Sequence, residues 1–183
     1  MTITLNRRLL IGVATLAAVI VAATTLLPGW LMASSAAEAT PELVVADFAR
    51  AYYTVDYRDQ QAWLGRLQPL MTEPGFITVK TQFAPVVWKS IASARFANTS
   101  EQVSAEALGP AAEGEGQVPA PHAWRIERVR VTLAPAARWP GMTANSADLN
   151  ILLERPRDGG EWKVVTTLSD QSVELFKQRG GSQ

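Results

Sequence analysis

The chain has 183 residues, with no cysteine and a single histidine. Without cysteine, neither a disulfide framework nor a cysteine-ligated zinc cluster can form. The lone histidine, His122, has no second histidine with which to share a metal ion, so metal binding is disfavoured. The composition therefore predicts a protein that holds no metal ion and no cofactor.

The chain also lacks an excess of charge of either sign, with 17 Lys and Arg against 17 Asp and Glu. A nucleic-acid-binding domain gathers positive charge on one face, so this balance predicts no direct nucleic-acid binding. The sequence contains no G-x-S-x-G elbow, no P-loop and no H-E-x-x-H motif. Hydrolase and nucleotide-binding mechanisms therefore have no support in its motifs.

One long stretch contains no charged residue and no proline, LLIGVATLAAVIVAATTLL at residues 9–27. As a helix it would be roughly 28 Å long, close to the hydrocarbon thickness of a bilayer. This length predicts a transmembrane helix over residues 9–32, including the flanking interfacial positions. A cleaved signal peptide is the alternative, because the small residues 35–37 resemble a cleavage site.

The charges around this stretch predict its orientation. Arg7 and Arg8 precede it, whereas the first charged residue after it is Glu38. The positive-inside rule then places residues 1–8 in the cytoplasm and the bulk of the chain outside. We expect a single-pass protein of the bacterial cytoplasmic membrane, with a spacer at residues 33–40, an external domain at 41–179 and a tail at 180–183.

Three helices are predicted to open the external domain. Each begins at a residue that can cap a helix N-terminus, namely Thr40, Asp59 and Thr72. Apolar residues recur behind each cap at helical spacing. Because proline disrupts helix interiors, Pro69 and Pro85 are expected to end the second and third helices.

Beyond residue 90 the apolar spacing becomes alternating, which is typical of strands. A first strand is weakly indicated by Phe96 and residues 103–107. The stretch from Gly109 to Pro121, rich in Gly, Pro and Ala, is predicted to be a mobile loop.

The next predicted strand has apolar residues in two phases. Trp124 and Ile126 alternate in one phase, and residues 129–133 alternate in the other. A regular strand would turn its apolar set over midway, so a β-bulge is predicted near Glu127 and Arg128.

The clearest hairpin signal is the pair of alternating runs at 149–153 and 162–168, joined by a turn that contains Asp158-Gly159. A last short helix is predicted to begin at Ser169 or Asp170. Helices followed by a run of antiparallel strands indicate an α+β fold.

This layout resembles the curved-sheet cone of the nuclear transport factor 2-like and ketosteroid isomerase-like superfamily. The segment FARAYYTVDYRDQQAWLGRLQPLMT at residues 48–72, with Asp56-Tyr57-Arg58-Asp59 followed by Trp63, Arg66 and Leu67, resembles the helical opening of bitopic bacterial proteins that carry this cone outside the membrane. Two such groups are the VirB-type scaffold proteins of type IV secretion and conjugation machines, and the membrane proteins associated with mammalian-cell-entry (Mce) lipid transporters.

The resemblance implies three helices packed on a curved, antiparallel four-stranded sheet. It also implies a non-enzymatic single-pass scaffold that touches membrane lipid through residues 9–32 and docks onto other subunits of an envelope-spanning complex. Type IV secretion, or conjugative transfer, is the first choice and Mce-associated lipid uptake the second. Homo-oligomerisation stays open.

A small-ligand binder or ketosteroid isomerase-like enzyme is the alternative of another class. Enzymes of this superfamily place an acid or base and an oxyanion-stabilising Tyr and Asp inside the cone, where apolar surroundings shift the carboxyl pKa. None of the six side chains available for these roles can be matched to one of them: Tyr52, Tyr53, Tyr57, Asp47, Asp56 and Asp170. No catalytic residue is predicted, and the chain is predicted not to be an enzyme.

Five residues are candidates for partner binding. Arg125, Arg128 and Arg130 recur around the change of phase, where guanidinium groups suit the carboxylates of a partner. A solvated outer face is the simpler interpretation of these arginines. Trp88 and Trp139 lie near prolines and are predicted to be exposed anchors. Three other tryptophans occupy apolar phases and are predicted to lie in the core, namely Trp63, Trp124 and Trp162.

Overall fold

The computed structural model describes residues 39–117 and 120–180. The chain divides between Ala37 and Glu38 into two units, and the described residues belong to the second. The predicted transmembrane helix at 9–32 and the predicted cytoplasmic residues 1–8 lie outside the described residues. Within the described part, no helix is both long enough and apolar enough to cross a bilayer.

The described unit is α+β, with helices first and a four-stranded antiparallel sheet after them. The helical elements are α2 (Pro41–Tyr53), α3 (Gln60–Leu67), a 3-10 turn (Gln68–Leu70), α4 (Glu73–Thr78), a π-helical segment (Val79–Phe83) and α5 (Ala84–Ala94). A short 3-10 turn (Ser100–Gln102) leads into the sheet.

Two of the predicted helix starts are confirmed by side-chain caps. The Asp59 carboxylate accepts a hydrogen bond from the Ala62 backbone N–H at 2.9 Å. The Thr72 hydroxyl accepts one from the Gly75 backbone N–H at 3.3 Å. Each cap satisfies a backbone donor that has no partner within its own helix. Thr40 is the N-cap residue of α2 as predicted, although its side chain makes no capping hydrogen bond, and Pro41 occupies the first turn.

The prediction that Pro85 ends the third helix is wrong. The chain stays helical from Glu73 to Ala94, and the π-helical segment joins α4 to α5. In this segment the Ala84 backbone N–H donates to the carbonyl of Val79, five residues earlier. The wider turn places Pro85 in the first turn of α5, where its missing N–H costs no hydrogen bond.

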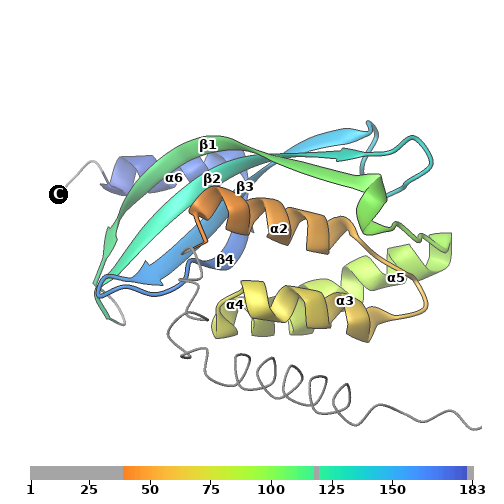
Figure 1. Ribbon diagram of the computed structural model, residues 1–183, viewed down its shortest axis with the longest axis horizontal. Helices are drawn as coiled ribbons and strands as arrows, with labels where there is room; N and C mark the ends of the chain where they lie inside the picture. The colour runs from red at the N-terminus through yellow and green to blue at the C-terminus, as the bar shows by residue number, and fades with distance from the viewer. Residues whose placement is uncertain (1–38, 118–119, 181–183) are drawn as a thin grey trace, which may run out of the picture. The chain divides into compact units, whose positions relative to one another are not determined.

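The sheet is a meander in the order β1-β2-β3-β4, with each neighbouring pair antiparallel. The strands are β1 (Val103–Gly116), β2 (His122–Leu133), β3 (Ser146–Pro156) and β4 (Lys163–Leu168). Figure 1 shows the sheet curving over α2, with α3 and α5 on the side of α2 away from the sheet, and the start of α4 packs against β4. This arrangement is compatible with a cone-like fold.

A last helix, α6 (Asp170–Gly180), covers part of the opposite face of the sheet. The Ser169 hydroxyl accepts a hydrogen bond from the Ser172 backbone N–H at 3.2 Å, which confirms the predicted start of this helix. The ring of Phe176 packs on Trp124 of β2, with the ring centroids 5.5 Å apart. The predicted β3–β4 hairpin is likewise confirmed by its register, which pairs Leu153 with Val164.

The predicted bulge in β2 near Glu127 and Arg128 is not found. β2 pairs with β3 without a register shift, and the two irregularities between β1 and β2 lie in β1, where Leu108 and Ala111 are the extra residues. Both apolar phases of β2 are buried because a different helix packs against each face of the strand. The helix α2 covers the phase of residues 129–133, and α6 covers the phase of Trp124.

The prediction of a mobile loop from Gly109 to Pro121 is wrong for most of its length, because β1 continues to Gly116. Its glycines leave room for rings on the neighbouring strand. A Cβ at Gly114 would lie 2.4 Å from the Trp124 ring, and one at Gly116 would lie 2.3 Å from the His122 ring. The first strand begins at Val103, so Phe96 is not part of it.

Candidate functional site

The structure separates the three candidate arginines. Arg125 points to the concave face of the sheet, where α2 packs, and it pairs with Glu42 of that helix. Arg128 and Arg130 are exposed on the outer face. The Arg130 guanidinium binds the Asp148 carboxylate through two hydrogen bonds, of 2.8 and 3.0 Å. The three side chains therefore do not form one docking surface.

Arg125 belongs to a partly buried charge cluster that contains Glu42 and Glu127. Arg125 Nη2 donates to Glu42 Oε1 at 2.9 Å, and Arg125 Nε lies 2.5 Å from Glu127 Oε1. The Glu127 side chain is fully buried, whereas Glu42 keeps contact with solvent. We call these three residues the concave charge cluster.

Burial dominates the electrostatics of Glu127. Removing this carboxylate from water raises its pKa, and the charge of Arg125 opposes that rise without cancelling it. Within the described part of the chain, Glu127 Oε2 has no hydrogen-bond partner, and Glu127 Oε1 has only the ion-pair contact with Arg125 Nε. The pKa of Glu42 is lowered instead, first by a hydrogen bond from its own backbone N–H at the start of α2.

A carboxyl group with a raised pKa inside a curved sheet is the type of group that enzymes use as a general acid or base. Such a group must also reach a substrate. Glu127 has no exposed surface, and the Arg125 guanidinium lies against its carboxylate. The geometry therefore makes Glu127 one half of a structural ion pair.

Sequence reasoning missed Glu127 because the residue was assigned to a bulge. The alternation of Val129, Val131 and Leu133 extends back to Glu127 and Arg125 once β2 is a regular strand. An acidic residue in phase with a buried apolar row is the signal that could have identified it.

Trp139 is the clearest departure from the predicted site. Its side chain is only 8% exposed, so the predicted exposure is wrong. The Trp139 ring centroid lies 5.0 Å from that of Tyr52 and 4.7 Å from that of Tyr53. Trp88 is half-buried and packs on Trp63, with the ring centroids 5.6 Å apart. Both predicted anchors therefore contribute to the aromatic core.

The side chains considered for catalysis do not converge. Burial raises the pKa of Tyr52 to about 12, so its hydroxyl stays protonated. Asp56 pairs with Arg58, which lowers the pKa of that carboxyl to about 2. Asp47 pairs with Arg50 at the surface. Asp170 accepts a hydrogen bond from Asn150 beside α6. Tyr53 lies in the core and Tyr57 stacks with Arg58.

Large side chains pack the interior of the fold. A hollow of about 30 Å³ lies between α2 and the helical segment 73–83, and it is lined by Phe48, Tyr52, Val79 and Phe83 among others. That volume holds about one water molecule. Trp162, at 8% exposure, and Phe76, packed against the core, are among the bulky side chains that occupy this interior.

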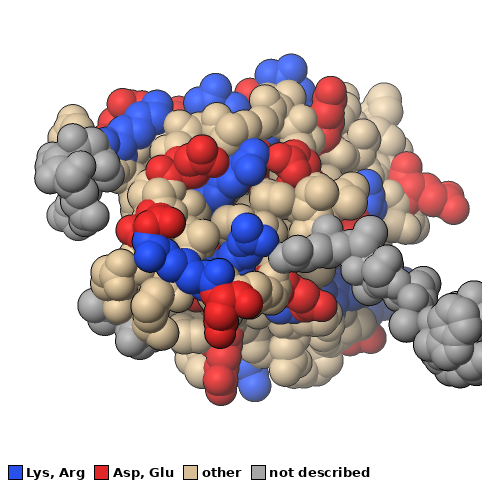
Figure 2. All heavy atoms as spheres, turned by 60° about the vertical axis from the view of Figure 1, so that its left-hand side comes forward, with Lys and Arg blue, Asp and Glu red and all other residues tan. Residues whose placement is uncertain are grey.

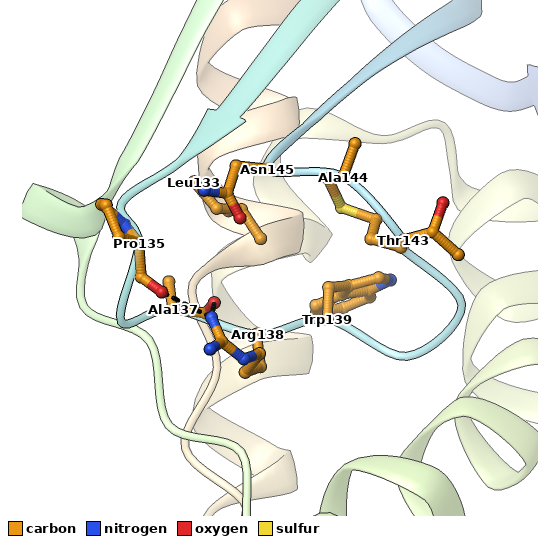
Figure 3. Close-up of a pocket in the computed structure, with 9 residues that line it drawn as sticks. Leu133, Pro135, Ala137, Arg138, Trp139, Thr143, Ala144 and Asn145 are labelled. Atoms are coloured by element: carbon orange, nitrogen blue, oxygen red, sulfur yellow. Dashed lines mark hydrogen bonds between the residues drawn. The ribbon is translucent and has the colours of Figure 1, made fainter.

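A hollow of about 390 Å³ lies against the loop between β2 and β3 (Figure 3). Asn98 holds this loop, since its amide donates to the Arg138 carbonyl at 2.6 Å and accepts from the Arg138 N–H at 3.1 Å. The guanidinium of Arg138 turns back onto the carbonyls of Pro135 and Ala137. No carboxylate, histidine or nucleophilic thiol lines the hollow.

A second surface hollow, of about 180 Å³, contains His122. His122 Nδ1 lies 2.8 Å from the carbonyl oxygen of Ala120. Among the described residues, no group of three His, Cys, Asp or Glu side chains is placed to hold a metal ion. On the face seen in Figure 2, positive and negative side chains are interspersed.

Comparison with known proteins adds no relative: no family model, no curated protein and no solved structure matches this chain.

Proposed function

We propose that the chain is a non-enzymatic, single-pass scaffold of a bacterial envelope complex, whose folded domain works by contact outside the cytoplasmic membrane. The observation that carries this proposal is the filled interior under the curved sheet. Aromatic side chains pack in the interior under the curved sheet, and Arg125 pairs with Glu127, the one fully buried carboxylate among the described residues. Contact at the surface is then the remaining means of function.

The outer face of β2 and β3 supplies a surface for such contact. Arg128 and Arg130 are exposed there, beside Asp148 and the small polar pair Thr132 and Ser146. Arginine forks beside small polar side chains suit a partner that presents carboxylates. This part of the proposal keeps two of the five residues that the sequence singled out.

Within this role, type IV secretion or conjugative transfer is the first assignment and association with an Mce lipid transporter the second. The two differ in the neighbours that the scaffold touches and not in the chemistry of the domain. Genes for coupling and assembly ATPases next to the gene for this chain would favour secretion. A lipid-transport permease cluster would favour the transporter.

The direct test is crosslinking in intact cells. A photoreactive amino acid at Thr132 lies on the proposed contact surface, and the same amino acid at the exposed Glu161, outside that surface, is the control. We expect Thr132 to trap a subunit of an envelope complex and Glu161 to trap much less. Absence of any trapped subunit, together with turnover of a small molecule by the purified chain, would refute the scaffold assignment.

A further inference from the structure

A second surface of the domain, on α4 and α5, combines exposed apolar side chains with positive charge. Ile77, Phe83 and Val86 are large hydrophobic residues with exposed fractions of 51%, 50% and 70%. They lie on the continuous helical segment from Glu73 to Ala94. The buried side of this segment is fixed to the core by Ile91 and others, so these three side chains are not part of the core.

Glu73 begins this segment, and every charged residue after it in the segment is positive. Between Pro74 and Ser100 the sequence contains Lys80, Lys89 and Arg95 but no Asp or Glu, and all three cations are exposed. The whole chain is neutral, so the remainder carries a matching excess of acidic groups. We call the exposed side chains of residues 77–95 the basic apolar surface.

Exposed apolar residues flanked by lysines on a helix are typical of segments that lie in the headgroup region of a bilayer. The apolar side chains enter the acyl boundary, and the cations meet anionic headgroups. An aqueous protein surface gains nothing from exposing Phe83 and Val86, whereas a membrane interface would bury both.

The length of the predicted spacer between the membrane helix and the domain also favours a bilayer as the partner of this surface. The spacer at residues 33–40 reaches at most about 30 Å when fully extended. A domain of this size is roughly 35 to 40 Å across. If residues 9–32 span the bilayer, a tether of this length gives any membrane-binding face of the domain a high effective concentration at that bilayer.

We therefore propose that the basic apolar surface docks onto the anionic bilayer that holds the predicted anchor, leaving the outer face of β2 and β3 directed to partners. This inference rests on the membrane anchor of the proposed function. It adds an orientation of the domain, in which α4 and α5 are the membrane-proximal elements.

The absence of cysteine allows a direct measurement on the full chain. A spin label is attached at Thr81→Cys, within the basic apolar surface, and at Thr132→Cys, on the outer face of the sheet. Both positions are exposed. The full chain is reconstituted into vesicles of phosphatidylcholine with phosphatidylglycerol, and the accessibility of each label to oxygen and to a water-soluble nickel complex is compared.

We expect the label at position 81 to be accessible to oxygen and shielded from the nickel complex. The label at position 132 should stay in water and remain accessible to the nickel complex. In vesicles of phosphatidylcholine alone, the difference in accessibility between the two labels should be smaller. The double variant Lys80→Gln/Lys89→Gln should lower the ratio of docked to undocked protein about 30-fold, since each lysine near an anionic surface contributes about fivefold. The control Arg128→Gln/Arg130→Gln removes the same charge and should leave the ratio unchanged.

Equally aqueous labels at both positions in anionic vesicles would overturn the inference. So would a Thr81 label that is aqueous in pure vesicles but shielded in native membranes, because the surface would then bind a protein partner. Alkaline carbonate extraction separates this failure from a failure of the anchor. Chain released by carbonate refutes the anchor, whereas chain retained with an aqueous Thr81 label refutes only the docking.

Discussion

The two faces of β2 carry the same kind of ion pair in opposite surroundings. On the concave face, Arg125 pairs with Glu127, which is fully buried. On the outer face, Arg130 pairs with Asp148, and both side chains are about half exposed. Burial raises the pKa of Glu127, whereas the Arg130 guanidinium lowers the pKa of Asp148. Each pair joins an arginine to a carboxylate, so solvent access decides whether the pair is structural or available for contact.

The largest effect should follow from breaking the concave pair. Arg125→Met leaves Glu127 buried without a counter-charge, which we expect to lower the free energy of unfolding by about 3 to 5 kcal/mol. Urea unfolding of residues 38–183, a compact unit of the chain, measures this change. The double variant Arg125→Met/Glu127→Leu should recover most of the loss, since an apolar pair replaces both charges. No loss in the single variant would show that Glu127 reaches solvent.

The pH dependence of stability should distinguish the two carboxylates. A raised pKa in the folded state gives Glu127 a contribution that is present below its ordinary pKa and lost as the pH rises through the folded value. Glu127→Gln should therefore become more stable relative to the parent chain as the pH rises from about 4 to 7.

Asp148 should behave in the opposite way. Its lowered pKa stabilises the fold above the ordinary pKa of an aspartate, and this contribution is lost in acid. Asp148→Asn should cost stability at neutral pH and less as the pH falls. Parallel pH profiles for the Glu127 and Asp148 variants would contradict the difference in burial.

The smallest effect should come from the outer pair. Arg130→Ala removes a solvent-exposed ion pair, so we expect little change in the free energy of unfolding, and salt should screen what change there is. Urea unfolding at low and high salt measures it. In cells, the same variant should reduce the crosslinking of Thr132 to its partner. A loss of stability as large as that of Arg125→Met would show that the outer pair also belongs to the core.

Local signals predicted the elements whose cause is local. Asp59 and Thr72 cap helices because each side chain accepts from a backbone N–H three residues ahead. The β3–β4 hairpin follows from alternation around a tight turn. Pro85 was misjudged because a π-helical segment, which no short motif announced, repositions it within a continuous helix.

The candidate site was less predictable, because burial depends on elements far apart in the sequence. Trp139 lies in a loop beside prolines, yet Tyr52 and Tyr53 of α2 enclose it. The segment from Gly109 to Gly116 has a loop-like composition, yet it pairs with β2. Aromatic rings of β2 fill the space beside its glycines. Glu127 was missed because the cover supplied by α6 made a regular strand resemble a bulged one.

The sequence by itself determined the α+β order, the helix caps, the hairpin turn and the neutral, cysteine-free composition, since each follows from neighbouring residues or from simple counting. Only the tertiary structure decided which side of each strand is covered. That decision placed Glu127 and Trp139 inside and Arg128 and Arg130 outside, because the cost of burying a charge or the gain from burying a ring depends on what packs against it.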